Sequence, residues 1–206
     1  MRSRLLRLAA LLPALVVVLA GCASTTLKSV WTDPGYAGGA FRKVFVIGLS
    51  SKDVTGRRLF EDIMAAKLQA AGVQAVPGWQ HLRGDGQADE SGLQAAVAQT
   101  GADAVLMARL LGVDTRTTVS TMVVPGPGYP YGWYGPYAGW YAVPTVTQYQ
   151  IATVETTLFD VKTRRLVWTA TSQTFNPTSV QEEAPGLADA VIASLRQAGF
   201  LPAGKN

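Results

Sequence analysis

The sequence predicts an α/β (α+β) fold in which helices pack on a single mixed β-sheet. Between residues 42 and 108, short apolar runs alternate with segments of helical periodicity, in the β-α-β-α-β order typical of an α/β sheet. From Val113 onward, three long segments rich in Thr and Val alternate between apolar and polar residues, as antiparallel hairpins do. A final segment with helical periodicity predicts a C-terminal helix.

The first strand and the first helix are predicted directly after residue 42. Lys43–Leu49 is a continuous apolar, β-branched run, which is typical of a strand buried on both faces. Asp53 or Thr55 can cap a helix that runs to Ala71, and Gly72 supplies its C-terminal stop. The helical period predicts one apolar stripe on this helix, made of Leu59, Ile63, Ala66 and Ala70.

A short strand, a second helix and a third strand follow. Val73–Val76 predicts the strand, which closes at a Pro-Gly turn. Asp89 or Ser91 begins the helix, and Gly101 ends it. Ala104–Ala108 then predicts another buried strand.

The second half predicts three long amphipathic strands and a helix. The strands are Val113–Val124, Thr145–Phe159 and Leu166–Phe175, and the last two are joined by a hairpin turn. The helix begins near Ser179, where Ser-Val-Gln-Glu has capping-box spacing, or at Pro185 as its first residue. Its predicted apolar positions and its stop are Leu187, Val191, Leu195, Ala198 and Gly199.

The first 21 residues have the pattern of a secretory signal peptide. Three arginines precede an apolar run of 14 residues, Leu8–Gly21. A helix that crosses a bilayer needs roughly 20 apolar residues, so a permanent transmembrane helix is disfavoured. Residues 23–40 are rich in Ser, Thr, Gly and Pro and have no clear period. We therefore expect a signal peptide over 1–21, a lipidated tether over 22–40 and a single α/β domain over 41–206.

Residues 19–22, Leu-Ala-Gly-Cys, resemble the lipobox of bacterial lipoproteins. The resemblance implies a diacylglyceryl thioether on Cys22, cleavage between Gly21 and Cys22, and an acylated new N-terminus. Two or more acyl chains anchor a protein stably to a membrane without spanning it. Ala23, and not an aspartate, follows Cys22. By resemblance to the sorting rule of enteric lipoproteins, this implies the periplasmic face of the outer membrane.

Charge and cysteine content argue against several classes of partner. Removal of the three leader arginines leaves 15 basic residues against 14 acidic ones, so no basic patch predicts a nucleic-acid partner. With Cys22 acylated, no cysteine remains for a disulfide. His81 is the single histidine, so no Cys/His cluster for zinc is present. We expect no cofactor and no metal site.

Two polar loops resemble ligand-binding motifs only superficially. Gly48–Lys52 follows a strand, but it lacks the spacing and the Gly-Lys-Ser/Thr ending of a Walker motif. Arg83–Glu90 collects three acids near two glycines, but not at the alternate positions of an EF-hand. We interpret both segments as solvated connections next to helix starts.

No set of side chains has the arrangement of a catalytic site. The pairs Glu61-Asp62 and Glu182-Glu183 are neighbours in sequence, so on a helix their carboxylates diverge. His81 follows a Pro-Gly turn, and the chain contains no Gly-x-Ser-x-Gly elbow. The sequence therefore predicts that the protein is not an enzyme.

Pro125–Pro144 is the most unusual segment of the chain. Its residues include five Pro, five Gly, five Tyr and two Trp, with no charge. Because Pro and Gly at this density oppose a regular strand ladder, we expect a loop at the tip of a hairpin. The candidate contact residues of this loop are Tyr129, Tyr131, Trp133, Tyr134, Tyr137, Trp140 and Tyr141.

Several functions fit an aromatic loop of this kind. Tyr and Trp favour surfaces with one apolar and one wet side. The loop can contact an envelope protein, mediate self-association, rest on lipid headgroups or stack on envelope glycan. It can also fold back over its own domain or be low-complexity sequence without a contact role.

Several motifs together resemble an uncharacterised family of Gram-negative lipoproteins. They are Trp31-Thr32-Asp33-Pro34, Lys43–Leu49, the Arg57-Arg58-x-x-Glu61-Asp62 pattern with Gly72, and the strand-turn-strand from Leu158 to Thr169. The pattern is also distantly similar to curli-secretion-type periplasmic domains and to the TolB N-terminal domain. The resemblance implies a periplasmic α/β fold and an envelope setting, and no catalytic residues.

These observations favour a membrane-anchored, non-enzymatic binding or envelope-assembly module that faces the periplasm. One alternative is an oligomeric subunit of a secretion or pore-type outer-membrane assembly, although both faces of residues 146–153 are too polar for a clean lipid face. A second alternative is an envelope glycan-binding protein.

Overall fold

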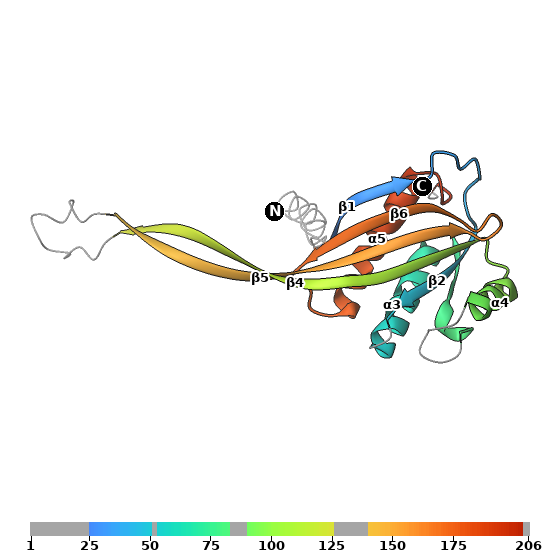
Figure 1. The fold of residues 1–206 in the computed structure, drawn as a ribbon, viewed down its shortest axis with the longest axis horizontal. Coiled ribbons are helices and arrows are strands. Elements are labelled where there is room, and N and C mark those ends of the chain that lie inside the picture. The colour runs from blue at the N-terminus through green and yellow to red at the C-terminus, as the bar shows by residue number, and fades with distance from the viewer. Residues whose placement is uncertain (1–24, 51–52, 83–89, 126–139, 204–206) are drawn as a thin grey trace, which may run out of the picture.

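The computed structural model describes residues 25–50, 53–82, 90–125 and 140–203. These residues form one six-stranded mixed sheet in the order β1-β6-β5-β4-β2-β3, with helices packed on it (Figure 1). The predicted fold class is confirmed.

The parallel part of the sheet is the predicted β-α-β-α-β unit. Strand β2 pairs in parallel with both β3 and β4. Asp53 is the N-cap of α3, and its carboxylate accepts the Gly56 N–H at 2.8 Å. Gly72 and Gly101 follow their helices with φ of +84° and +64°, a conformation that favours glycine. The elements are β2 (Lys43–Leu49), α3 (Val54–Ala70), β3 (Gln74–Pro77), the 3-10 helix η2 (Gly78–Gln80), α4 (Glu90–Thr100) and β4 (Ala104–Pro125).

The buried face of α3 differs from the predicted stripe. Arg57, Glu61, Met64, Ala65 and Leu68 are buried, whereas Ala66 and Ala70 are exposed. A reading by hydrophobicity cannot place Arg57 and Glu61 in the interior, because ionised side chains are rarely buried unless paired. Here they form an i,i+4 ion pair.

The antiparallel part consists of β4, β5 (Trp140–Asp160), β6 (Arg165–Phe175) and β1 (Thr25–Thr32). The predicted hairpin between the last two long strands is confirmed as β5–β6. The segments predicted as separate strands at 104–108 and 113–124 form one continuous strand, β4. A bulge between Leu110 and Gly112 shifts the register, and the pairing with β5 continues beyond Gly112.

Part of the predicted tether is instead a strand. Residues 25–32 form β1, which pairs antiparallel with the outer edge of β6. Its side chains are mostly exposed, so its sequence carries no alternation of apolar and polar residues. An edge strand of this kind is stabilised by a partner about 140 residues away, and local periodicity cannot reveal that partner.

The predicted loop over 125–144 is too long at both ends. Strand β4 extends to Pro125 and β5 begins at Trp140, and the two residues face each other in the ladder. Among the described residues, each of the two strands has one edge without a neighbouring strand here, which is the setting in which a strand tolerates proline. Residues 126–139 lie outside the described residues.

Helix α5 (Val180–Gln197) begins at the first of the two predicted sites. The Ser179 hydroxyl accepts the Glu182 N–H at 3.3 Å, whereas Pro185 lies inside the helix. Leu187, Val191 and Leu195 are buried as predicted, and Gly199 follows with φ of +80°.

Two hydrophobic clusters cover opposite faces of the sheet. The larger cluster packs α3 and α5 against one face, around Trp168 and Leu106. The smaller cluster packs α4 against the other face, around Phe45 and Val105. Side chains alternate between the two faces along each strand, so β2 and β4 are buried on both.

We predict that Trp168→Ala lowers the free energy of unfolding by about 3–5 kcal/mol, the typical cost of removing a fully buried large aromatic side chain. The indole of Trp168 is 0% exposed. Trp31 is the matched control, because it lies on the neighbouring strand β1 and is 46% exposed. Urea denaturation should show a change of less than about 1 kcal/mol for Trp31→Ala. Equal losses in the two variants would contradict this assignment of the core.

Candidate binding surfaces

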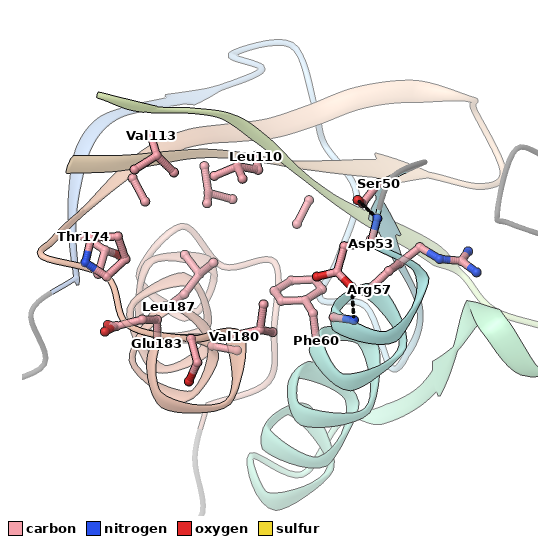
Figure 2. A pocket seen from close by; sticks show the side chains of 18 of the residues that line it. Ser50, Asp53, Arg57, Phe60, Leu110, Val113, Thr174, Val180, Glu183 and Leu187 are labelled. Carbon is pink, nitrogen blue, oxygen red and sulfur yellow. Dashed lines mark hydrogen bonds between the residues drawn. The ribbon is translucent and has the colours of Figure 1, made fainter. Parts of the chain in front are cut away.

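The larger hydrophobic cluster does not fill the space at the end of the sheet where the β4–β5 hairpin projects beyond the other strands. A cavity of about 390 Å³ lies there between α3, α5 and strands β4 and β5. We call it the α3–α5 groove. Figure 2 shows side chains from three elements directed into it: Phe60 from α3, Leu110 and Val113 from β4, and Val180 and Leu187 from α5.

The polar groups around the α3–α5 groove are engaged by the local backbone. The Asp53 N–H donates to the Ser50 hydroxyl at 3.2 Å, and the Asp53 carboxylate caps α3. At the other end, Thr178 donates from its N–H and its hydroxyl to Glu183, each at 3.4 Å. The walls between these ends are mainly apolar, so the groove suits a hydrophobic occupant.

One wall of the groove is fixed by a buried carboxylate. Glu61 accepts the Gly48 N–H at 3.0 Å and the Trp79 N–H at 2.6 Å, so it ties together β2, α3 and η2. The Arg57 Nη1 lies 3.9 Å from Glu61 Oε1. Figure 2 shows the Arg57 side chain directed away from the groove, which its stem lines.

Burial raises the pKa of Glu61 above its ordinary value of 4.5. The two backbone N–H groups, followed by Arg57, favour the ionised form and offset part of this effect. The Arg57 guanidinium is itself buried, and none of its nitrogens has a hydrogen-bond partner among the described residues. The carboxylate is thus the better satisfied member of the pair.

The second surface is a two-stranded ribbon that projects beyond the sheet (Figure 1). We call residues 111–125 of β4 and 140–150 of β5 the β4–β5 arm. Its backbone pairing is continuous to Pro125 and Trp140. Several large apolar side chains of the arm are more than half exposed: Val119, Met122, Val123 and Val146.

The two faces of the β4–β5 arm differ in charge. Directly opposed residues of an antiparallel pair lie on the same face. The face of the arm that points away from the α3–α5 groove carries Asp114 and Arg116, which are paired with Ile151 and Tyr149. The groove-side face has no ionisable residue from 113 to 123 and continues the lining of the α3–α5 groove outward. Its pairs are Val113–Ala152, Thr115–Gln150, Thr117–Gln148, Val119–Val146, Thr121–Pro144 and Val123–Ala142.

Both backbone edges of the arm lack a neighbouring strand among the described residues. Strand β2 pairs with β4 only along Ala104–Arg109, and β6 pairs with β5 only along Ile151–Asp160. Unpaired N–H and C=O groups on such edges are sites at which a further strand can add.

A second cavity, of about 670 Å³, lies near the β5–β6 turn, and its polar groups are also used structurally. Asp103 accepts the Arg42 and Lys43 N–H groups at 2.8 and 2.9 Å. Asp160 accepts the Lys162 N–H at 2.8 Å. Burial, followed by the Asp160 carboxylate, raises the pKa of Tyr36 above its ordinary value of 10.0.

Most of the predicted site residues lie outside the described residues. These are Gly21, Cys22, Tyr129, Tyr131, Trp133, Tyr134 and Tyr137. Trp140 and Tyr141 form the start of β5, opposite Pro125 and Val124. His81 follows η2, with its ring centroid 6.2 Å from that of Phe45. Within the described ranges, no three His, Cys, Asp or Glu side chains gather where they could hold a metal ion.

The sequence did not predict the α3–α5 groove. It is built from single side chains of elements that are distant in sequence, including Phe60 and Leu187. The arm did carry a signal in the sequence, since Val119 and Val146 are large apolar residues within otherwise Thr-rich and Gln-containing strands.

We predict that ionisation of Glu61 weakens the fold. Above pH 4.5 and below its raised pKa, folded Glu61 binds more protons than unfolded Glu61, so this group lowers the free energy of unfolding as pH rises through that window. Glu61→Gln removes the titration. Urea denaturation should show that, as pH rises above 4.5, the free energy of unfolding of wild type falls relative to that of Glu61→Gln. Parallel pH profiles for the two proteins would contradict the prediction.

No protein-family model and no curated protein matches the sequence. Among solved structures, the chain is similar to the PelC dodecamer from Paraburkholderia phytofirmans, with 16% identity, a TM-score of 0.43 and coverage of 87% of this chain and 99% of that one. It is also similar to the lipoprotein GNA1162 from Neisseria meningitidis, with 16% identity, a TM-score of 0.42 and coverage of 76% and 99%. No family membership follows from these similarities.

Proposed function

We propose that the protein is a lipid-anchored, non-enzymatic binding or assembly module of the bacterial envelope, and that the β4–β5 arm is its contact surface. The observation that carries the proposal is the exposure of large apolar side chains along a two-stranded ribbon that leaves the sheet. Val119 and Val146, opposed on one face, are 64% and 62% exposed.

We expect an isolated two-stranded ribbon of this kind to be stabilised by contact with a binding partner. Two-stranded hairpins are at best marginally stable in water, and contiguous exposed apolar surface marks interaction sites. The groove-side face of the arm also lacks charge from residue 113 to 123. Burial of this face against another surface therefore incurs no cost of desolvating an ion.

The anchor in this proposal is an acylated Cys22 on the periplasmic face of the outer membrane. The charged leader, the apolar run and the Leu-Ala-Gly-Cys motif support it. No helix among the described residues is long and apolar enough to cross a membrane.

A second candidate is an oligomeric subunit of a secretion or pore-type assembly. The two open backbone edges of the arm favour it, because each can accept a strand from a neighbouring copy. The partner would then be a second arm of the same sequence. The glycan-binding alternative depends on the aromatic residues at 129–141.

The proposed anchor predicts the mass of the mature N-terminus. In a bacterial host that processes lipoproteins, mass spectrometry should find a first residue Cys22 bearing acyl chains, and a labelled palmitate supplied to the cells should enter the protein. Cys22→Ala should abolish the label. A wild-type protein that keeps residues 1–21 and a free Cys22 thiol would contradict the proposal.

The proposed contact surface predicts a difference between adjacent positions of the arm. A photo-reactive amino acid at Val119 lies on the groove-side face, and one at Thr118 lies on the opposite face. Irradiation in cells should give protein adducts from position 119, and these should disappear when Val146→Glu is added. Thr147→Glu, on the opposite face, is the matched control.

The adduct mass distinguishes the two candidates. Multiples of the protein's own mass support the oligomeric subunit, and a different added mass supports a heterologous envelope partner. Equal labelling from positions 118 and 119, insensitive to Val146→Glu, would contradict the arm as the contact surface.

A further inference from the structure

We propose that the α3–α5 groove is a binding site for an acyl chain carried by the protein's own Cys22. The inference rests on the proposed lipidation of Cys22. It adds a second location for the lipid, inside the domain, beside its location in the membrane.

The start of β1 lies beside the groove. Thr25, the first residue of β1, is buried and faces Thr174 of β6, with their hydroxyl oxygens 2.7 Å apart. Thr174 lines the α3–α5 groove. Cys22 precedes Thr25 by three residues, which span at most about 10 Å when extended. A lipid on Cys22 is therefore tethered by three residues to a strand end that borders the groove.

The chemistry of the groove matches a hydrocarbon chain. Phe60, Val113 and Leu187 are directed into it (Figure 2), and Ala152 and Val154 complete the wall on β5. The acidic side chains Asp53 and Glu183 lie at the helix N-termini. Asp53 accepts a hydrogen bond from the Gly56 N–H, and Glu183 accepts one from the Thr178 N–H. The arginine that lines the groove does so with its stem, and its guanidinium lies near Glu61.

The size of the groove favours one flexible chain over a ribbon from another copy. Its volume of about 390 Å³ falls within the range of small-ligand pockets, ~300–1,000 Å³. A β4–β5 arm is two strands wide, with about 4.8 Å between strand axes, and brings Thr and Gln side chains with it.

Covalent attachment also favours the protein's own lipid over free phospholipid. A ligand held on a short tether has an effective concentration in the millimolar range. A free phospholipid lacks this tether, so the tether favours the protein's own acyl chain over an unlinked chain of the same length. One chain in the groove leaves the remaining acyl chain or chains of Cys22 in the membrane.

The test is photo-crosslinking in the full-length, processed protein. A photo-reactive amino acid replaces Leu110, which lines the groove and is 55% exposed, in cells grown with alkyne-tagged palmitate. The control position is Leu111, which is 50% exposed and does not line the groove. Both positions tolerate a large side chain because neither is buried.

The expected product is an internal link between the peptide that contains position 110 and the acylated peptide that begins at Cys22. Position 111 should not give it. Gln150→Trp, at the groove mouth, should abolish the link, whereas Gln148→Trp, on the same face but outside the lining, should leave it intact. Circular dichroism of both tryptophan variants checks that they fold.

Other products overturn the inference in distinguishable ways. A phospholipid on the position-110 peptide identifies the bilayer as the source of the chain, and a crosslinked dimer identifies a second copy. Palmitate-labelled protein without any internal link leaves the anchor intact and excludes the groove as its binding site. Protein without palmitate label overturns the proposed lipidation itself.

Discussion

The Glu61 carboxylate holds together the part of the molecule on which its surfaces are built. It lies where β2 ends, α3 passes and η2 begins, and it accepts one backbone N–H from each neighbouring element. Position 48 must approach α3 closely for this contact, since a Cβ there would lie 3.0 Å from Arg57 Cγ and 3.3 Å from Phe60 Cδ1. The same approach places Phe60 in the groove. A buried carboxyl group thus sets the geometry of an apolar surface.

Strands β4 and β5 change character along their length. Leu106 and Leu158 are opposed in the fully buried centre of the sheet, whereas Val119 and Val146 are opposed in the exposed arm. The bulge after Leu110 lies at the boundary between the two environments. One end of this hairpin is therefore buried in the core, and the other end exposes apolar side chains and unpaired backbone edges.

Local signals in the sequence were sufficient for most elements but not for their long-range partners. The apolar run of β2, the Asp53 and Ser179 caps and the glycine stops depend on neighbouring residues. The run and the stops were predicted, and each cap was one of two predicted alternatives. Strand β1 escaped prediction because its pairing with β6 connects distant segments and leaves most of its side chains in solvent. The buried face of α3 was missed because it contains an ion pair. The groove escaped prediction because no single segment contains it.

The length of the arm determines the distance from the core at which the molecule can first contact a partner. Fifteen residues of β4 beyond the bulge, at about 3.3 Å per residue, extend roughly 50 Å. The described residues outside the arm number about 130, and a compact domain of that size has a radius of gyration of about 14 Å. Most of the volume swept by the rotating molecule is therefore reached by the ribbon alone. Its drag also makes the particle tumble and sediment more slowly than a sphere of equal mass.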